Sequence, residues 1–194
     1  MTKQNLGANS PMTSDNHLME DVKTGKVEKL AVLFEKHHVQ LFNFFLRLTG
    51  NRGVSEDLVQ DVFLRILKYR KTYRGQSKFT VWMYQIARNA HIDHLRKGKG
   101  ELPLDDQWED VTEPDPSPAA QLERGEDIDI VRQALAQLPL KKREVLVLSR
   151  FQDLKYREIA ELLGCQIGTV KAHVHRAIKD LGKIYYELSG GAAS

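Results

Sequence analysis

The segment 73–97 mixes basic and aromatic side chains, and this combination suits contact with unpaired nucleic acid. Basic side chains can follow a phosphate backbone, and aromatic faces can stack on unpaired bases. A loop beside them can hold a base extruded from a duplex. The alternative is that Phe79 and Trp82 are simply anchors of the protein core. The mixed set comprises Tyr73, Arg74, Lys78, Phe79, Trp82, Tyr84, Arg88, Arg96 and Lys97.

A second pattern, in residues 156–179, predicts a helix-turn-helix. Apolar residues line one side of a short helix, Gly164 permits a left-handed turn, and the apolar stripe continues on the next helix. In proteins of this kind the second helix enters the major groove of DNA. The alternative is a plain helical hairpin with a solvated basic face. The side chains near the start of the second helix that we expect to face DNA include Thr169, Lys171, His173, His175 and Arg176.

Sequence patterns typical of enzymes and metal sites are missing from this chain. It contains no GxxxxGK[ST], HExxH or GxSxG. His91 and His94 lie three residues apart on one predicted helix, but no Cys or carboxylate stands at ligand spacing beside them. The single cysteine, Cys165, excludes an internal disulfide and a multi-cysteine zinc site. We therefore predict a binding protein rather than an enzyme, with no cofactor, no metal and no small-molecule substrate.

The elements that must position these side chains are all predicted to be helices. Apolar residues recur at steps of three and four along most of the chain, and no pair of strands is predicted. Ser55 is the expected N-cap of the second helix. The fold class is therefore all-α, with two small helical domains. The predicted helices span residues 18–49, 56–69, 80–97, 121–138, 141–151, 156–163 and 169–188.

Charge changes sign twice along the chain. Residues 1–97 hold 16 Lys and Arg against 9 Asp and Glu, residues 98–130 hold 2 against 11, and residues 131–194 hold 11 against 6. The middle segment is also rich in proline, which favours an extended acidic linker. The predicted organisation is a disordered tail at 1–17, a helical domain at 18–97, the linker at 98–124, the helix-turn-helix domain at 125–188 and a tail at 189–194.

Neither a membrane helix nor a secretion signal is apparent in the sequence. No apolar run approaches the roughly 18 residues that a membrane helix needs, and the first residues lack the apolar core of a signal peptide. We therefore expect a cytoplasmic protein that does not insert into a membrane.

Three motifs, in their order along the chain, resemble those of bacterial sigma factors of the sigma-70 family, specifically the small extracytoplasmic-function (ECF) group. They are SEDLVQDVFLRILK, FTVWMYQIARNAHIDHLRK and LPLKKREVLVLSRFQDLKYREIAELLGCQIGTVKAHVHRAIKDL. The resemblance covers about residues 25–97 and 125–188. It implies that the first domain is sigma region 2 and the second is sigma region 4.

The resemblance also implies a role for each group of residues. Core RNA polymerase, through the clamp of its largest subunit, would bind Asp57, Gln60, Asp61 and Phe63. A solvated acidic first turn is the alternative for the polar members of that group. The promoter −10 element would be melted and held by Tyr73, Arg74, Lys78, Phe79, Trp82, Arg88, Asn89 and Arg96, with Asp93 on or behind the same surface. The −35 element would be read by Thr169, Lys171, His173, His175 and Arg176.

The partners implied by the resemblance are core RNA polymerase, promoter DNA and an anti-sigma factor. One departure concerns the recognition helix, where such sigma factors often carry Ser and Arg after the Lys but this chain has Ala172 and His173. The alternative function is a LuxR-type transcriptional regulator, because residues 139–174 resemble the helix-turn-helix of that family almost as well. A LuxR-type protein would need a receiver or ligand domain upstream, and the first domain has no alternation of strands and helices to build one.

Overall fold

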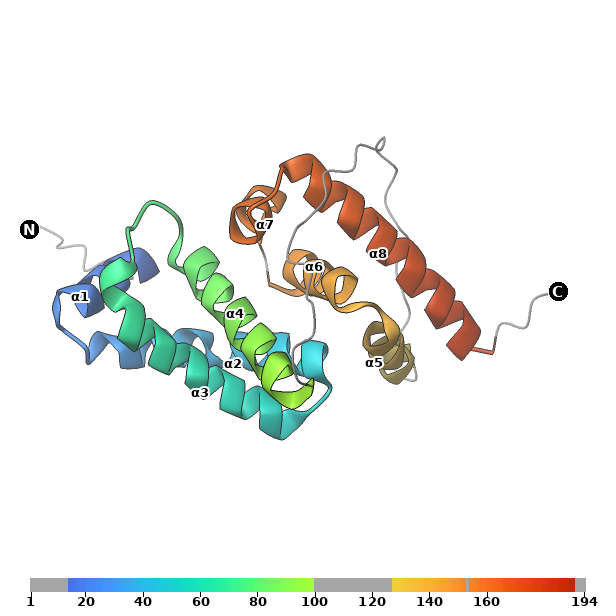
Figure 1. Ribbon diagram of the computed structural model, residues 1–194, viewed down its shortest axis with the longest axis horizontal. Coiled ribbons are helices and arrows are strands. Elements are labelled where there is room, and N and C mark those ends of the chain that lie inside the picture. The colour runs from blue at the N-terminus through green and yellow to red at the C-terminus, as the bar shows by residue number, and fades with distance from the viewer. Residues whose placement is uncertain (1–13, 100–126, 153, 191–194) are drawn as a thin grey trace, which may run out of the picture.

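The computed structural model describes residues 14–99, 127–152 and 154–190, which form two groups of helices lying side by side (Figure 1). No strand occurs among these described residues, so the prediction of an all-α fold is confirmed. The predicted acidic linker lies almost entirely outside them. The first group comprises α1 (Asp15–Thr24), α2 (Lys29–Thr49), α3 (Arg52–Tyr69), a short 3-10 helix (Arg70–Thr72) and α4 (Phe79–Lys99). The second comprises α5 (Asp127–Gln137), α6 (Leu140–Phe151), α7 (Tyr156–Leu163) and α8 (Ile167–Leu188).

The core of the first group is built from the apolar faces of α2, α3 and α4. Phe44 and Phe45 on α2, Ile66 on α3 and Met83 on α4 are all fully buried. The rings of Phe44 and Phe45 meet edge to face, with centroids 5.3 Å apart. Burial of side chains of this size stabilises the fold by roughly 1.5–3 kcal/mol each. This core fixes the relative positions of α3 and α4, which carry most of the predicted functional residues of the first domain.

The second group forms the predicted helix-turn-helix from α7 and α8. Gly164 ends α7 with a φ of 67°, a left-handed conformation that glycine adopts without strain. The Cys165 backbone N–H then donates to the carbonyl of Ala160 at 3.0 Å, which closes the turn. Val170 and Val174, on the apolar stripe of α8, are buried against the rest of the group. The opposite side of α8 is therefore left for other contacts.

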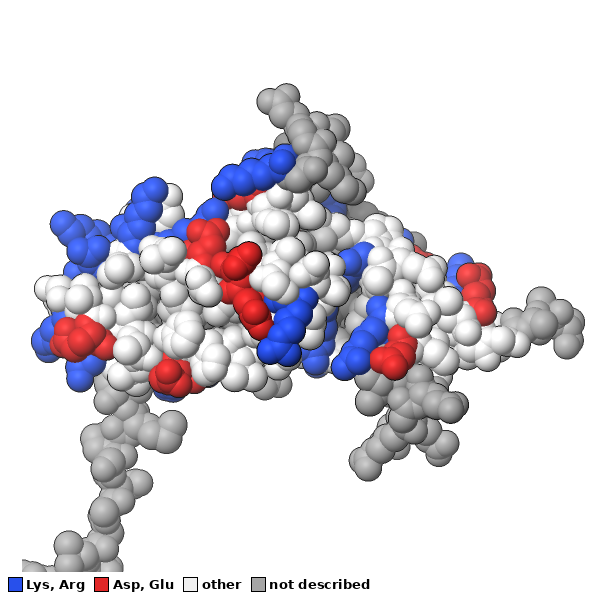
Figure 2. All heavy atoms as spheres, turned by 90° about the horizontal axis from the view of Figure 1, so that it is seen from below, with Lys and Arg blue, Asp and Glu red and all other residues white. Residues whose placement is uncertain are grey.

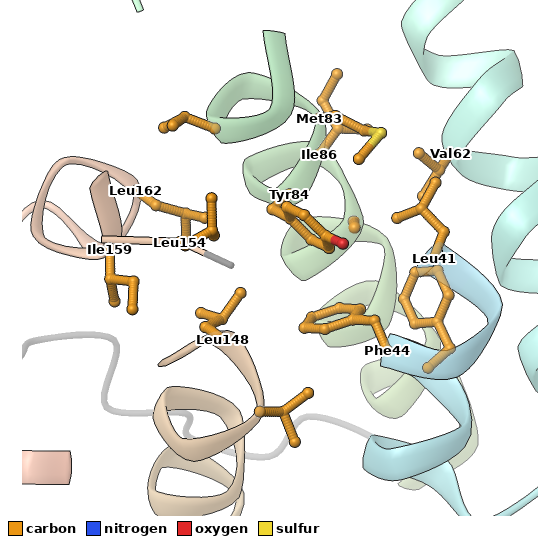
Figure 3. Close-up of a cluster of buried hydrophobic side chains, with 14 of the residues drawn as sticks. Leu41, Phe44, Val62, Met83, Tyr84, Ile86, Leu148, Leu154, Ile159 and Leu162 are labelled. Carbon is orange, nitrogen blue, oxygen red and sulfur yellow. The ribbon is translucent and has the colours of Figure 1, made fainter. Parts of the chain in front are cut away.

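The two groups share one continuous hydrophobic core. Figure 3 shows Phe44 of the first group pointing toward Leu148 of the second, and the ring of Tyr84 meets that of Phe44 with centroids 5.2 Å apart. The Tyr84 hydroxyl, itself buried, donates a hydrogen bond to the side chain of Gln152. The contacts between the two groups are most extensive between α2 and α6 and between α4 and α7. The structure is thus a closed arrangement in which α4, the helix with the predicted −10 residues, is partly covered.

Several helix boundaries differ from the sequence prediction, most clearly those of α1 and α3. The predicted helix 18–49 is broken at Gly25, which has a φ of 115°, and α1 begins at Asp15, inside the predicted tail. The helix α3 begins at Arg52 rather than at residue 56, because Asn51 is its N-cap and accepts from the Val54 N–H at 3.0 Å. Ser55, the expected cap, is buried and donates its hydroxyl to the Asn51 carbonyl at 2.6 Å.

Candidate DNA and polymerase interfaces

The outward side of α8 carries exposed basic and titratable side chains near its N-terminus. Lys171 and His175 are exposed and Arg176 is half-buried. Lys171 and His175 are four residues apart and therefore share one face of the helix. No acidic residue occurs between Ile167 and Lys179. This face, near the N-terminal end of the helix, is therefore suited to contact a polyanion.

Two other residues predicted to face DNA from α8 lie differently. Thr169 is only 2% exposed, so its side chain lies inside the protein. The prediction that its side chain faces outward is therefore wrong. His173 is half-buried, with its Nε2 atom inside the protein. The exposed recognition surface consequently depends on Lys171 and His175, with Arg176 at its edge.

The aromatic residues of the loop before α4 are largely part of the core. Tyr73 is 2% exposed and Phe79 is fully buried, which corrects the prediction that both present their rings to DNA. Both pack on Trp82, with ring centroids 5.2 Å and 6.4 Å away, respectively. Trp82 alone of the three is half-buried rather than fully buried. The alternative of a core anchor, which the sequence left open, applies most strongly to Phe79.

The exposed part of this region is polar. Arg74 and Lys78 in the loop and Asn89 and Arg96 on α4 all have exposed side chains. Arg74 and Lys78 precede the half-buried Trp82 in the chain, and Asn89 and Arg96 follow it. The loop therefore carries cations that are close in sequence to one partly accessible ring. A cationic loop with one aromatic face retains the chemistry of unpaired-base binding, with fewer stacking rings than the sequence predicted.

Two of the predicted −10 residues form ion pairs with the second group of helices. The Arg88 guanidinium lies 3.2 Å from the Glu144 carboxylate, and their side chains are only 15% and 6% exposed. The Lys78 ammonium lies 2.6 Å from a carboxylate oxygen of Glu158. Burial alone would raise the pKa of Glu158, but hydrogen bonds from Lys78 and the Lys155 backbone outweigh it and lower the pKa. In this closed arrangement, Arg88 and Lys78 are paired with acidic side chains of the second group of helices.

Further contacts join the two groups of helices at the C-terminal end of α2. Arg143 donates from Nη1 to the Leu48 carbonyl at 2.7 Å. The Arg47 guanidinium lies over the ring of Phe151, 4.3 Å from its centroid. Burial lowers the pKa of both guanidinium groups from their ordinary range, although each stays charged. We call this set of contacts, together with the Arg88–Glu144 and Lys78–Glu158 pairs, the interdomain clasp.

The acidic side of α3 is the predicted polymerase surface. Asp57 and Gln60 are exposed, and Asp61 is half-buried and lies 2.9 Å from Arg65. Arg65 also pairs with Asp93 of α4 at 2.6 Å, so this one guanidinium group links a carboxylate of α3 to a carboxylate of α4. The face drawn in Figure 2 carries acidic side chains gathered in a band between basic ones.

Phe63, the fourth residue predicted to contact polymerase, is not on that surface. Its side chain is 7% exposed and its ring meets Phe34 edge to face, with centroids 4.9 Å apart. The prediction of a direct contact from Phe63 is therefore corrected, because the ring faces α2. Its position supports the packing of α3 on α2.

A shallow hollow of about 300 Å³ lies beside the exposed residues of α3 and was not predicted from the sequence. Its lining combines apolar side chains with polar and charged ones, and consists of Phe34, His38, Val39, Phe42, Arg52, Glu56, Val59 and Gln60. Val39, 55% exposed, extends the apolar surface along α2. The signal in the sequence was the surplus of apolar residues on α2, which exceeds what one buried face requires. The hollow and the acidic side of α3 together form a surface suited to a protein partner.

Two histidines, His37 and His91, are buried and are explained by packing. His91 is 2% exposed, and burial, with smaller contributions from the charges of His94 and Arg143, lowers its pKa to about 4. His37 lies 2.9 Å from the Asp15 carboxylate.

Within residues 14–99, 127–152 and 154–190, no three His, Cys, Asp or Glu side chains converge as a metal site would require. In that same part of the chain, no helix combines the length and apolarity needed to cross a membrane.

Comparison with known proteins identifies the family. The model for sigma-70 region 2 matches residues 33–101, and the model for sigma-70 region 4 matches residues 128–181. The chain is 31% identical over 158 residues to RNA polymerase sigma factor YlaC of Bacillus subtilis, which covers 80% of this chain and 91% of YlaC. The chain belongs to the sigma-70 family of RNA polymerase sigma factors, in its ECF group. As a sigma factor it directs core RNA polymerase to promoters and initiates transcription.

Two further relatives support this assignment. The ECF sigma factor EcfG of Rhodopseudomonas palustris is 32% identical over 144 residues, covering 74% of this chain and 77% of EcfG. The crystal structure of the sigma factor RpoE in complex with the anti-sigma factor NepR, from Bartonella quintana, superposes with a TM-score of 0.61 at 25% identity, covering 79% of this chain and 94% of that one. The LuxR-type alternative is not favoured, because the first group of helices matches sigma region 2.

Proposed function

We propose that this sigma factor divides its work among three surfaces: α8 for the −35 element, α4 with its preceding loop for the −10 element, and α3 with the adjoining hollow for core polymerase. The exposed face of Lys171 and His175 on α8 carries the proposal most directly. It is an accessible cationic face at the start of a helix in a helix-turn-helix, where side chains reach base edges and phosphates.

On the −10 side, the proposal assigns the capture of unpaired bases to Trp82 and to the exposed residues around it. Stacking of one base on an aromatic ring contributes roughly 1–3 kcal/mol, which offsets the few kcal/mol of unstacking that base. Arg74 and Lys78 supply charge for the backbone on either side. The sigma factor thus opens DNA by binding energy alone, with no catalytic step of its own, and acts in the cytoplasm.

Core polymerase docking is assigned to Asp57, Gln60 and Asp61, with the apolar side chains that line part of the hollow as the adjoining contact area. An exposed apolar surface rimmed by polar side chains is typical of protein interaction sites. Asp57 is the most informative residue to change, because it is exposed and its substitution leaves the Asp61–Arg65 pair in place.

The interdomain clasp has a consequence for the proposed mechanism. Arg88 and Lys78 are engaged by Glu144 and Glu158, so both cations reach DNA only after the second group of helices moves away from α4. The closed arrangement therefore stands for the chain before it binds a promoter. We further propose that an anti-sigma factor restrains this protein, in keeping with the sigma factor RpoE, whose solved structure contains the anti-sigma factor NepR.

A pair of charge changes tests the division of labour. With Asp57→Arg, we expect the chain to lose binding to core polymerase while α8 still binds duplex DNA. With Lys171→Ala, we expect normal assembly with core and weakened transcription from promoters that depend on a −35 element. Affinity for fluorescently labelled core measures the first effect, and run-off transcription measures the second. Loss of core binding in Lys171→Ala, or normal core binding in Asp57→Arg, would contradict the assignment.

A further inference from the structure

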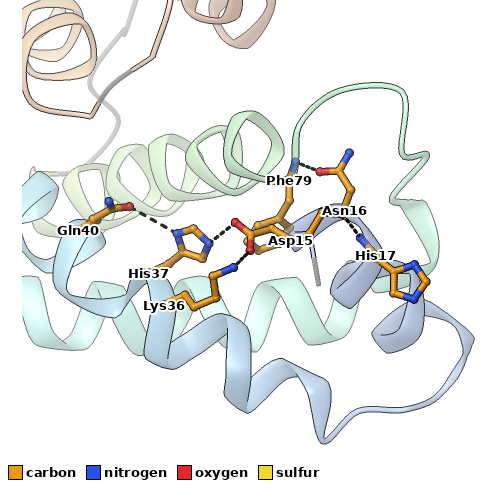
Figure 4. Close-up of polar contacts among 8 residues, drawn as sticks. Asp15, Asn16, His17, Lys36, His37, Gln40 and Phe79 are labelled. Carbon is orange, nitrogen blue, oxygen red and sulfur yellow. Dashed lines mark hydrogen bonds and ion pairs between the residues drawn. The ribbon is translucent and has the colours of Figure 1, made fainter. Parts of the chain in front are cut away.

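Asn16, at the start of α1, makes two hydrogen bonds to the segment that leads into α4, and Figure 4 shows the one to Phe79. Its Nδ2 donates to the Ser77 carbonyl at 3.2 Å, and its Oδ1 accepts from the Phe79 backbone N–H at 2.8 Å. Sixty-one and sixty-three positions separate these partners in the chain. A residue from the region predicted as a tail therefore fixes the end of the loop 73–78.

The chemistry of the contact requires an amide side chain. The first N–H groups of a helix have no partner inside the helix, so Asn16 supplies an acceptor that α4 itself lacks at Phe79. Ser77 presents a carbonyl, which needs a donor. Asparagine offers one donor and one acceptor in a single planar group, and only one orientation of the amide satisfies both partners.

The base from which Asn16 acts is itself well anchored. Asp15, the preceding residue, lies 2.9 Å from Nε2 of the buried His37 and also pairs with Lys36 (Figure 4). Partial burial works to raise the pKa of Asp15, but the hydrogen bonds and charges of Lys36 and His37 lower it overall, so the carboxylate stays ionised. Leu18 and Met19 on the next turn are buried in the core. The start of α1 is therefore a fixed point to which the loop is tied.

The loop held by this contact carries the exposed residues assigned to unpaired bases. The Tyr73 hydroxyl donates to the same Ser77 carbonyl at 3.4 Å. The Phe79 ring packs against the His37 ring, with centroids 5.5 Å apart. Arg74 and Lys78 lie between these two fixed ends with exposed side chains. A loop fixed at both ends loses less conformational freedom when it binds a base, and this strengthens binding.

We propose that Asn16 is a positioning residue for promoter opening, which holds the loop 73–78 in the conformation that captures an unpaired base of the −10 element. The inference rests on the proposed function of that loop. Asn16 touches no DNA in this account, and its effect passes through Ser77 and Phe79.

The test compares two templates for the holoenzyme formed with core polymerase. One is a duplex promoter on which the wild-type chain starts transcription, and the other is the same promoter with its −10 bases left unpaired by mismatches. On the duplex, base capture must drive melting, whereas on the unpaired template that work has already been done. We expect Asn16→Ala to lower the ratio of duplex to unpaired-template transcription about 25-fold, which corresponds to about 2 kcal/mol at 1.4 kcal/mol per factor of ten, since it removes both hydrogen bonds that hold the loop.

Asn51→Ala is the matched control. It removes the side-chain acceptor from the N-terminus of α3, where Asn51 accepts from Val54 at 3.0 Å. The helix α3 has 18 residues at ~1.5 Å each, so that end lies about 27 Å from the opposite end of the helix, from which the chain continues toward the loop. We expect this variant to lose comparable thermal stability while keeping the wild-type ratio, because a general loss of folded protein affects both templates equally.

Asn16→Asp provides a second variant in case Asn16→Ala does not fold. It keeps the acceptor for the Phe79 N–H and loses the donor to Ser77, so its ratio is expected between those of Asn16→Ala and the wild type. Hydrogen exchange of the Phe79 amide in the full chain should rise in Asn16→Ala. A wild-type ratio in the folded Asn16 variants would overturn the inference. Failure of the wild-type chain to start transcription with core would instead refute the proposed function.

Discussion

The Arg88–Glu144 pair of the interdomain clasp makes a quantitative prediction. Both side chains are largely buried, at 15% and 6% exposure. A hydrogen bond to a charged group contributes about 1.5–3 kcal/mol, so Glu144→Gln should destabilise the closed arrangement by about 2 kcal/mol. At 1.4 kcal/mol per factor of ten, the population of the separated arrangement should rise about 25-fold.

The second ion pair of the clasp should matter less. Lys78 is 64% exposed in its pair with Glu158, and exposed pairs contribute about 0–1 kcal/mol. Glu158→Gln should therefore raise the separated population by no more than about fivefold. Glu161→Gln removes an acidic charge from an exposed position on the same helix and should leave the population unchanged.

A buried thiol at the interface measures the separated population even when it is small. Leu154 is 6% exposed and faces the first group of helices (Figure 3), so Leu154→Cys in a Cys165→Ser background places one thiol there. Its rate of alkylation is proportional to the fraction of molecules in which the groups have separated. We expect the rate to rise about 25-fold with Glu144→Gln, at unchanged helical content. A rate within twofold of the parent would refute the claim that this pair holds the groups together.

Three other predictions follow from single sites. Arg176→Ala should weaken −35-dependent run-off transcription less than Lys171→Ala, because Arg176 is half-buried and Lys171 exposed; equal losses would contradict this ranking. The pKa of His91 is about 4 in the folded state against 6.5 ordinarily, so the unfolded chain binds the extra proton first as pH falls. The free energy of unfolding should therefore drop by about 3 kcal/mol between pH 6.5 and 4, and His91→Gln should flatten that part of a denaturant-based stability profile. Gly164→Ala should cost about 1 kcal/mol in thermal unfolding, because φ is 67° while no atom lies near the added Cβ.

Much of the helical architecture was predictable because it depends on local periodicity. The helix 156–163 and the turn at Gly164 follow from apolar spacing and one glycine, and the structure has them as predicted. The break at Gly25 was missed because apolar residues continue on both sides of it at helical spacing. The start of α3 was misplaced because both Asn51 and Ser55 are good N-caps, and only the buried position of Ser55 decides between them.

The candidate site was harder to predict than the fold, because the sequence does not reveal whether the ring of an aromatic residue packs inside the protein or faces solvent. Tyr73 and Phe79 lie in a basic segment and read as stacking platforms, yet the start of α1 and the ring of Trp82 cover them. The Arg88–Glu144 pair joins residues 56 positions apart. Contacts of that range depend on how the two groups of helices pack, which local patterns do not encode.

The most direct test of the account is reconstitution with purified core RNA polymerase on a library of genomic fragments. The account predicts new transcripts with defined start sites when the wild-type chain is added. Asp57→Arg should abolish them together with core binding, and Lys171→Ala should reduce them with core binding retained. If the wild-type chain assembles with core but directs no new start sites, the central claim that these helices recognise and open promoters is contradicted.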